Sequence, residues 1–320
     1  MNQLTTSLSC IGYEDNYAKF YLNNPNDNLL YVVFGVKGTK PGKFAFFKTF
    51  MLLKVNILFI APDGDNWYQN GIPSFGKNIE EICLKLDGLI TVLIEEFGFK
   101  EIRLFGSSMG GYLSLVYISH SNLNAPLNAL VMGAETKLKL PYSQSLACSF
   151  EVRDEYKDIR FLNFKSRNVD MLSGEFDLID TYSTLCMKNT PGFKVHTHMF
   201  SGHVFPRTIE DTIGMHTFLK DFFGGSKYFI GKGHLSSYLN ANDLEPLIHA
   251  TQFSKEYIDC IESCLRKYSG FGWAWNRLGV YLHNQDRLEE AKNALEKSLL
   301  IHATNANTIE HLDIINKKMS

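Results

Sequence analysis

The chain has 320 residues, a net charge of −2 and a sequence pI of about 6.6, and 45% of its residues are hydrophobic. These values are typical of a globular protein that buries a sizeable core, with length for one large domain and a small one. The balanced charge excludes a dominant basic surface, so we expect no nucleic-acid partner.

The N-terminal sequence MNQLTTSLSC has neither the basic start nor the apolar stretch of a signal peptide. The longest apolar run, 51–61, is interrupted by Lys54 and Asn56 and predicts a buried strand, and a membrane helix needs roughly 18 apolar residues. We therefore expect a cytoplasmic protein without a membrane span. The scattered cysteines predict neither a disulfide framework nor a metal site, and Cys260 and Cys264, one helical turn apart, are expected to be small buried side chains.

Short apolar runs alternate with helical patterns along the first two thirds of the chain. Strands are predicted at 29–34, 55–60, 102–105, 130–132, 169–172 and 193–198, with one more short strand considered at 159–163. Helices are predicted at 78–97, 109–119 and 208–223. The alternation predicts an α/β fold, with a mostly parallel sheet covered by helices on both faces.

The composition changes after residue 225, which predicts three parts. Residues 1–225 form the main domain, 226–250 a loop-like linker and 251–320 an all-helical segment. Within that segment, Trp275, Gly279 and Ala291 have the spacing of large and small residues that packs two helices closely, and this resembles one tetratricopeptide repeat. The match departs from the pattern at Ser298 and Ala303. A plain helical hairpin packed on the main domain is an equal alternative.

The strongest local motif is Gly106-Ser107-Ser108-Met109-Gly110, which fits G-x-S-x-G between a predicted strand and a predicted helix. A tight strand-to-helix turn exposes the central hydroxyl, and glycines on either side let the two elements approach. The motif predicts Ser108 as a nucleophile.

A histidine base is expected after the last strand, where His203 lies in Gly-His-Val; His196 and His198 are rivals, but they fall within the strand itself. An acid that orients the histidine is expected after the strand before it. The Gly-x-x-Asp pattern at Gly174 favours Asp177, with Asp180 and Glu175 as alternatives.

Backbone N–H groups near the serine would stabilise an oxyanion. Met109 supplies one at the start of its helix, and Val36, just past the first strand, is expected to supply the second. Gly35, Trp67 and Tyr68 are predicted to line the substrate pocket, because both loops follow parallel strands at the same edge of the sheet. The aromatic pair is equally compatible with a role as loop anchors.

Taken together, the G-x-S-x-G turn, the Gly-x-x-Asp segment and the Gly-His after the last strand resemble the α/β-hydrolase family over residues 25–225. The resemblance implies acyl transfer through an acyl-enzyme on Ser108, with no cofactor and no metal. The absence of a long helical lid between 133 and 168 suggests small acyl groups.

Three functions fit these residues. The first is a serine carboxylesterase or deacylase. The second is an O-acyltransferase that uses the same three side chains, for example acetylating a bacterial surface saccharide with acetyl-CoA as donor. The third is a binding module with an inert hydrolase fold. The helical C-terminus could bind a protein partner, mediate self-association or support the main domain.

Overall fold

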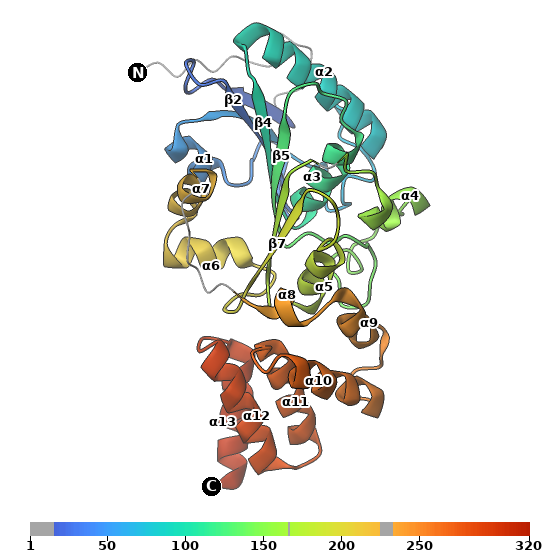
Figure 1. Cartoon of the computed structure of the whole chain (residues 1–320), viewed down its shortest axis with the longest axis vertical. Helices are drawn as coiled ribbons and strands as arrows, with labels where there is room; N and C mark the ends of the chain where they lie inside the picture. The colour runs from blue at the N-terminus through green and yellow to red at the C-terminus, as the bar shows by residue number, and fades with distance from the viewer. Residues whose placement is uncertain (1–15, 166, 225–232) are drawn as a thin grey trace.

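The computed structural model describes residues 16–165, 167–224 and 233–320 (Figure 1). Cys10 and residues 226–232 of the predicted linker lie outside the described residues. In the described part of the chain, no helix has the length and apolar character needed to cross a membrane.

A seven-stranded sheet forms the centre of the molecule, in the order β1-β3-β2-β4-β5-β6-β7. Only β1 runs antiparallel to its neighbour, and every other pairing is parallel. This arrangement confirms the predicted α/β architecture and is that of the α/β-hydrolase fold. The strands are β1 (Ala18–Tyr21), β2 (Leu29–Phe34), β3 (Asn56–Ile60), β4 (Glu101–Ser107), β5 (Leu127–Met132), β6 (Val169–Gly174) and β7 (Phe193–His198).

Helices cover both faces of the sheet (Figure 1). On one face, α2 (Ile79–Phe97) and α3 (Met109–His120) enclose the larger hydrophobic core. The other face carries α1 (Phe47–Leu53), α6 (Phe205–Thr212) and α7 (Met215–Phe223), which close a second core. The single helix predicted over 208–223 is therefore two helices. The chain turns at Gly214, whose φ of 79° ends α6 before α7 begins.

The connection from β5 to β6 contains little regular structure. It holds the short helix α4 (Asp154–Lys157) and a 3-10 turn at Ile159–Phe161, so the strand considered at 159–163 is not formed. The described residues of this connection include no long lid helix. After β6, α5 (Leu178–Cys186) returns the chain to β7.

The predicted linker is partly helical. It contains α8 (Leu235–Tyr238) and α9 (Ala241–His249), and a capping box between Asn240 and Asp243 starts α9. Their apolar side chains pack against α5 in a third core, which continues into the C-terminal helices. Short helices held by tertiary packing leave little periodicity in the sequence, so the prediction of a loop was wrong over 235–249.

The C-terminal segment continues the same core below the sheet in Figure 1. Its helices are α10 (Lys255–Lys267), α11 (Gly272–Asn284), α12 (Leu288–Ile301) and α13 (Ala306–Met319). As the spacing of small residues predicts, α11 and α12 pack closely: a Cβ at Gly279 would lie 2.6 Å from the Leu295 side chain. The assignment to a tetratricopeptide repeat remains a prediction.

Candidate active site

Ser108 occupies a strained turn between β4 and α3. Its φ and ψ are 51° and −120°, and its N–H donates to the carbonyl of Met132 on β5 at 2.8 Å. The turn depends on close backbone approach, because a Cβ at Gly106 would lie 2.3 Å from the Gly110 carbonyl oxygen, and one at Gly110 would lie 2.7 Å from the Gly35 carbonyl oxygen. The sequence therefore builds the G-x-S-x-G turn in the predicted form.

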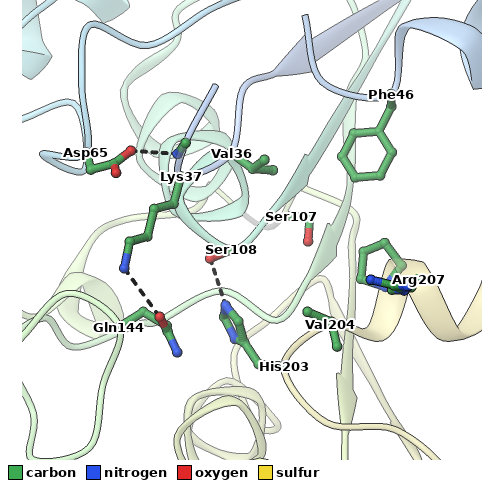
Figure 2. Close-up of a pocket in the computed structure, with 12 residues that line it drawn as sticks. Val36, Lys37, Phe46, Asp65, Ser107, Ser108, Gln144, His203, Val204 and Arg207 are labelled. Atoms are coloured by element: carbon green, nitrogen blue, oxygen red, sulfur yellow. Dashed lines mark hydrogen bonds between the residues drawn. The ribbon is translucent and has the colours of Figure 1, made fainter. Parts of the chain in front are cut away.

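His203 meets the serine hydroxyl. Its Nε2 lies 3.0 Å from Ser108 Oγ, the hydrogen bond that Figure 2 draws in the middle of the pocket. The imidazole is 21% exposed, so it is held by its surroundings yet open to the pocket. The rivals are engaged elsewhere: His196 pairs with Asp170 at 3.1 Å, and the His198 ring packs against Phe205.

Asp180, rather than the predicted Asp177, lies against the far side of the imidazole. Both of its carboxylate oxygens are 3.0 Å from His203 Nδ1, and its side chain is 1% exposed. Asp177 instead caps α5, since its Oδ1 accepts from the Asp180 N–H at 2.9 Å. The two aspartates differ because Asp177 fixes the start of the helix, whereas Asp180, in the first turn, faces the histidine.

The surroundings of the imidazole are anionic. Burial by itself lowers the pKa of His203, but the carboxylates of Asp180, Asp177 and Glu135 outweigh burial and raise that pKa to about 9. Burial, assisted by Asp177, raises the pKa of Asp180 to about 6. Between these two values the pair is a carboxylate and an imidazolium, so the fraction of His203 able to accept a proton grows as the pH rises.

The same groups give the site its one candidate metal-ligand set among the described residues. Asp177, Asp180 and His203 place ligand atoms within 4.8 Å of one another. All three already have partners, because Asp177 caps α5 and Asp180 binds His203. Hydrogen bonding within the protein accounts for this geometry.

Two predicted oxyanion donors lie beside Ser108. Met109 begins α3, where intrahelical bonding leaves the first N–H groups unpaired. The Val36 N–H, by contrast, donates to Thr39 Oγ1 at 3.1 Å. Val36 lines the same pocket as Ser108, so its position is as predicted while its N–H is engaged within its own loop.

The pocket at Ser108 has a volume of about 570 Å³ and opens to solvent. Two loops and one helix that the sequence did not connect to the site contribute to it. The lining residues are Val36, Lys37, Gly38, Phe46, Asp65, Ser107, Ser108, Gln144, His203, Val204, Pro206 and Arg207 (Figure 2). Most of these positions follow a predicted strand or a predicted site residue in the chain, which is the signal that could have found them.

The prediction that Gly35, Trp67 and Tyr68 line the pocket was wrong. Trp67 is fully buried and stacks on Phe150, with ring centroids 5.6 Å apart. Tyr68 is also fully buried, and its hydroxyl donates to the Gly35 carbonyl at 2.8 Å. Positive φ values of 51° and 61° at Trp67 and Tyr68 turn this loop back on itself. The aromatic pair therefore anchors its loop and supports the segment before Val36.

The C-terminal helices reach the loop between β6 and α5, the helix that carries the acid. Phe176 donates its backbone N–H to the Ser201 carbonyl at 2.9 Å, in the loop that leads to His203. The Phe176 ring packs against the His302 ring, with centroids 4.6 Å apart. A Cβ at Gly272 would lie 2.4 Å from the Phe176 ring. Phe176 thus connects α11 and α12 to the loop that leads to His203 and to the segment just before α5, which carries Asp180.

Comparisons with known proteins find similarity to solved structures at low sequence identity. No protein-family model and no curated protein matches this chain. A sugar hydrolase from Lactococcus lactis is 16% identical with a TM-score of 0.47 and covers 70% of this chain and 98% of its own. MenH from S. aureus is 16% identical with a TM-score of 0.44, over 65% of this chain and 98% of that one. A glycosylation-associated protein complex from Streptococcus agalactiae is 15% identical with a TM-score of 0.44, over 66% of this chain and 45% of that one.

Proposed function

We propose that this protein is a serine hydrolase that cleaves esters of small acyl groups through an acyl-enzyme on Ser108. The observation that supports the proposal is the continuous hydrogen-bond chain from Ser108 through His203 to Asp180, each link being 3.0 Å. A serine held at positive φ, with its hydroxyl on a histidine that a buried carboxylate orients, is arranged for nucleophilic attack.

The residues divide the reaction as follows. His203 Nε2 takes the proton of Ser108 Oγ as the oxygen attacks the ester carbonyl, and Asp180 stabilises the resulting imidazolium. The Met109 N–H stabilises the oxyanion of the tetrahedral intermediate, and the Val36 N–H joins it once Thr39 releases that donor. The imidazolium then protonates the departing alcohol. Water, activated by the same imidazole, hydrolyses the acyl-enzyme.

Hydrolysis is favoured over transfer to a saccharide for two reasons. The pocket opens to solvent, so water reaches the acyl-enzyme. Moreover, Trp67 and Tyr68, the aromatic pair predicted to line the pocket, are fully buried and offer no ring face for a sugar to stack on. O-acyl transfer with acetyl-CoA as donor therefore stays a second candidate without a structural feature of its own. The binding-module alternative leaves the connected serine, histidine and aspartate unexplained.

The test is covalent labelling followed by turnover. A fluorophosphonate probe is expected to label the wild-type chain and not the Ser108→Ala variant, and Ser107→Ala, which removes the neighbouring hydroxyl, is the matched control. Hydrolysis of para-nitrophenyl acetate should be lost in Ser108→Ala and retained in Ser107→Ala. Absence of labelling in the folded wild-type protein would overturn the proposal. Acetylated product that forms only when a saccharide is added would favour the transferase.

A further inference from the structure

The wall of the Ser108 pocket carries two cationic side chains. Lys37 extends from the loop after β2 and Arg207 from the first turns of α6, and Figure 2 shows them on opposite sides of Ser108 and His203. The carboxylate in the lining is Asp65, which is exposed and whose Oδ1 accepts from the Gly38 N–H at 2.6 Å. The entrance is therefore positive by formal charge, although the chain as a whole is slightly acidic.

Lys37 has little to hold it in the free protein. Its Nζ meets Gln144 Oε1 at 3.5 Å, a long contact with a neutral acceptor. It forms no ion pair with a carboxylate among the residues that the structure describes. Lys37 is half-buried as a residue, and an ammonium with one weak neutral partner keeps donors available for an anion from outside.

Arg207 is similarly available. Its Nε lies 3.7 Å from Asp211 one helical turn later, and the arginine side chain is 80% exposed. Exposed pairs of this length contribute little and exchange readily with solvent. Val36, Phe46 and Pro206 add apolar side chains to the same lining.

We infer that this pocket selects anionic esters, in which a carboxylate or phosphate lies a few bonds from the scissile carbonyl and binds Lys37, with Arg207 attracting it at the entrance. The inference rests on the proposed function, because the ester is placed by Ser108. It assigns Lys37 as a specificity-determining residue. A cation in the wall of the pocket strengthens both the encounter and the bound state of an anion.

The test compares matched esters on the full-length chain. Para-nitrophenyl hemisuccinate against para-nitrophenyl butyrate places the charge on the acyl side. Para-acetoxybenzoate against its methyl ester places it on the alcohol side. We expect wild-type kcat/KM to favour the anionic member of one pair by at least about tenfold, and Lys37→Gln to reduce that ratio by about tenfold, the size of a charge-assisted hydrogen bond. Added salt should reduce the same ratio.

Matched controls separate the site from general charge. Lys43→Gln removes an exposed lysine of the same loop region that does not line the pocket, and Arg266→Gln removes an arginine with the same kind of helical ion pair on α10. Both controls should retain the wild-type ratio, whereas Arg207→Gln should lower it. A wild-type ratio at or below one in both pairs would overturn the inference, and so would a Lys37→Gln loss shared equally by charged and neutral esters.

Binding keeps the test decisive if turnover is absent. The Ser108→Ala variant is titrated with the same four esters by ligand-observed NMR, with and without Lys37→Gln. Preferential binding of an anionic ester that requires Lys37 would support the anionic pocket even where fluorophosphonate labelling had rejected the hydrolase. Equal binding of charged and neutral members would reject the pocket's selectivity while leaving the hydrolase proposal intact.

Discussion

Two aspartates three residues apart allow a direct test of which carboxylate works with His203. Asp180→Asn keeps the shape of the side chain but removes the charge that orients and stabilises the imidazolium, so kcat should fall by about four orders of magnitude. Asp177→Asn makes the same chemical change in a side chain that caps α5, and asparagine caps a helix equally well. The protein should therefore remain folded and active.

The second variant should nevertheless change the pH profile. Asp177, Asp180 and His203 place their ligand atoms within 4.8 Å of one another. At that separation the Coulomb energy is about 3.5 kcal/mol at an effective dielectric of about 20, and about 1 kcal/mol in water. Since about 1.4 kcal/mol corresponds to one pKa unit, removing the charge should lower the pKa of His203 by between about 0.6 and 2.5 units.

The direction in which the pH profile shifts follows from the role of His203 as the base. His203 accepts a proton only when neutral, so kcat/KM rises with pH through its raised pKa of about 9 in the wild type. Loss of the Asp177 charge should move this rise to lower pH. The assay is hydrolysis of para-nitrophenyl acetate from about pH 5 to 10, with circular dichroism as the control for folding. If Asp177→Asn abolished activity while Asp180→Asn retained it, the assignment of the acid would be refuted.

Three further changes probe the surroundings of the serine. Thr39→Val removes the acceptor that engages the Val36 N–H, a bond of about 1 kcal/mol, so kcat should rise about fivefold; an unchanged or lower kcat would count against Val36 as an oxyanion donor. Gly110→Ala places a methyl group 2.7 Å from two backbone carbonyl oxygens and should cost about 1–3 kcal/mol of unfolding free energy by denaturant titration, with loss of fluorophosphonate labelling. Phe176→Ala should lower kcat about tenfold in a folded protein and Phe176→Leu should restore most of it; an unaltered kcat in the alanine variant would separate the C-terminal helices from the site.

Much of the sheet was predictable because its central strands are continuous apolar runs, as buried parallel strands require. β1 was not, since four residues at an edge, pairing through their backbone, carry almost no pattern. The helices α8 and α9 were missed for a related reason. They are formed by packing against α5, whereas isolated helices of this length are marginal in water.

The site shows the same division. Ser108 follows β4 directly and His203 lies in the loop just after β7, so counting along the chain from the predicted strands finds both. Asp180 depends on where α5 begins, and a shift of three residues exchanges a helix cap for a partner of the imidazole. Trp67 and Tyr68 face inward because both have left-handed backbone conformations, and no local sequence motif predicts these. Lys37 and Arg207 line the same pocket only because the fold brings their two segments to it.

The contact of Phe176 with α11 and α12 couples the active site to a surface remote from the entrance of the pocket. A molecule that binds α11 and α12 and shifts Gly272 by a fraction of an ångström would displace the Phe176 ring. The Phe176 backbone, which donates to Ser201, would transmit that displacement. Such binding would leave the entrance of the pocket unobstructed. Truncating the chain at residue 250 to obtain a smaller enzyme would remove both the packing on Phe176 and this remote surface.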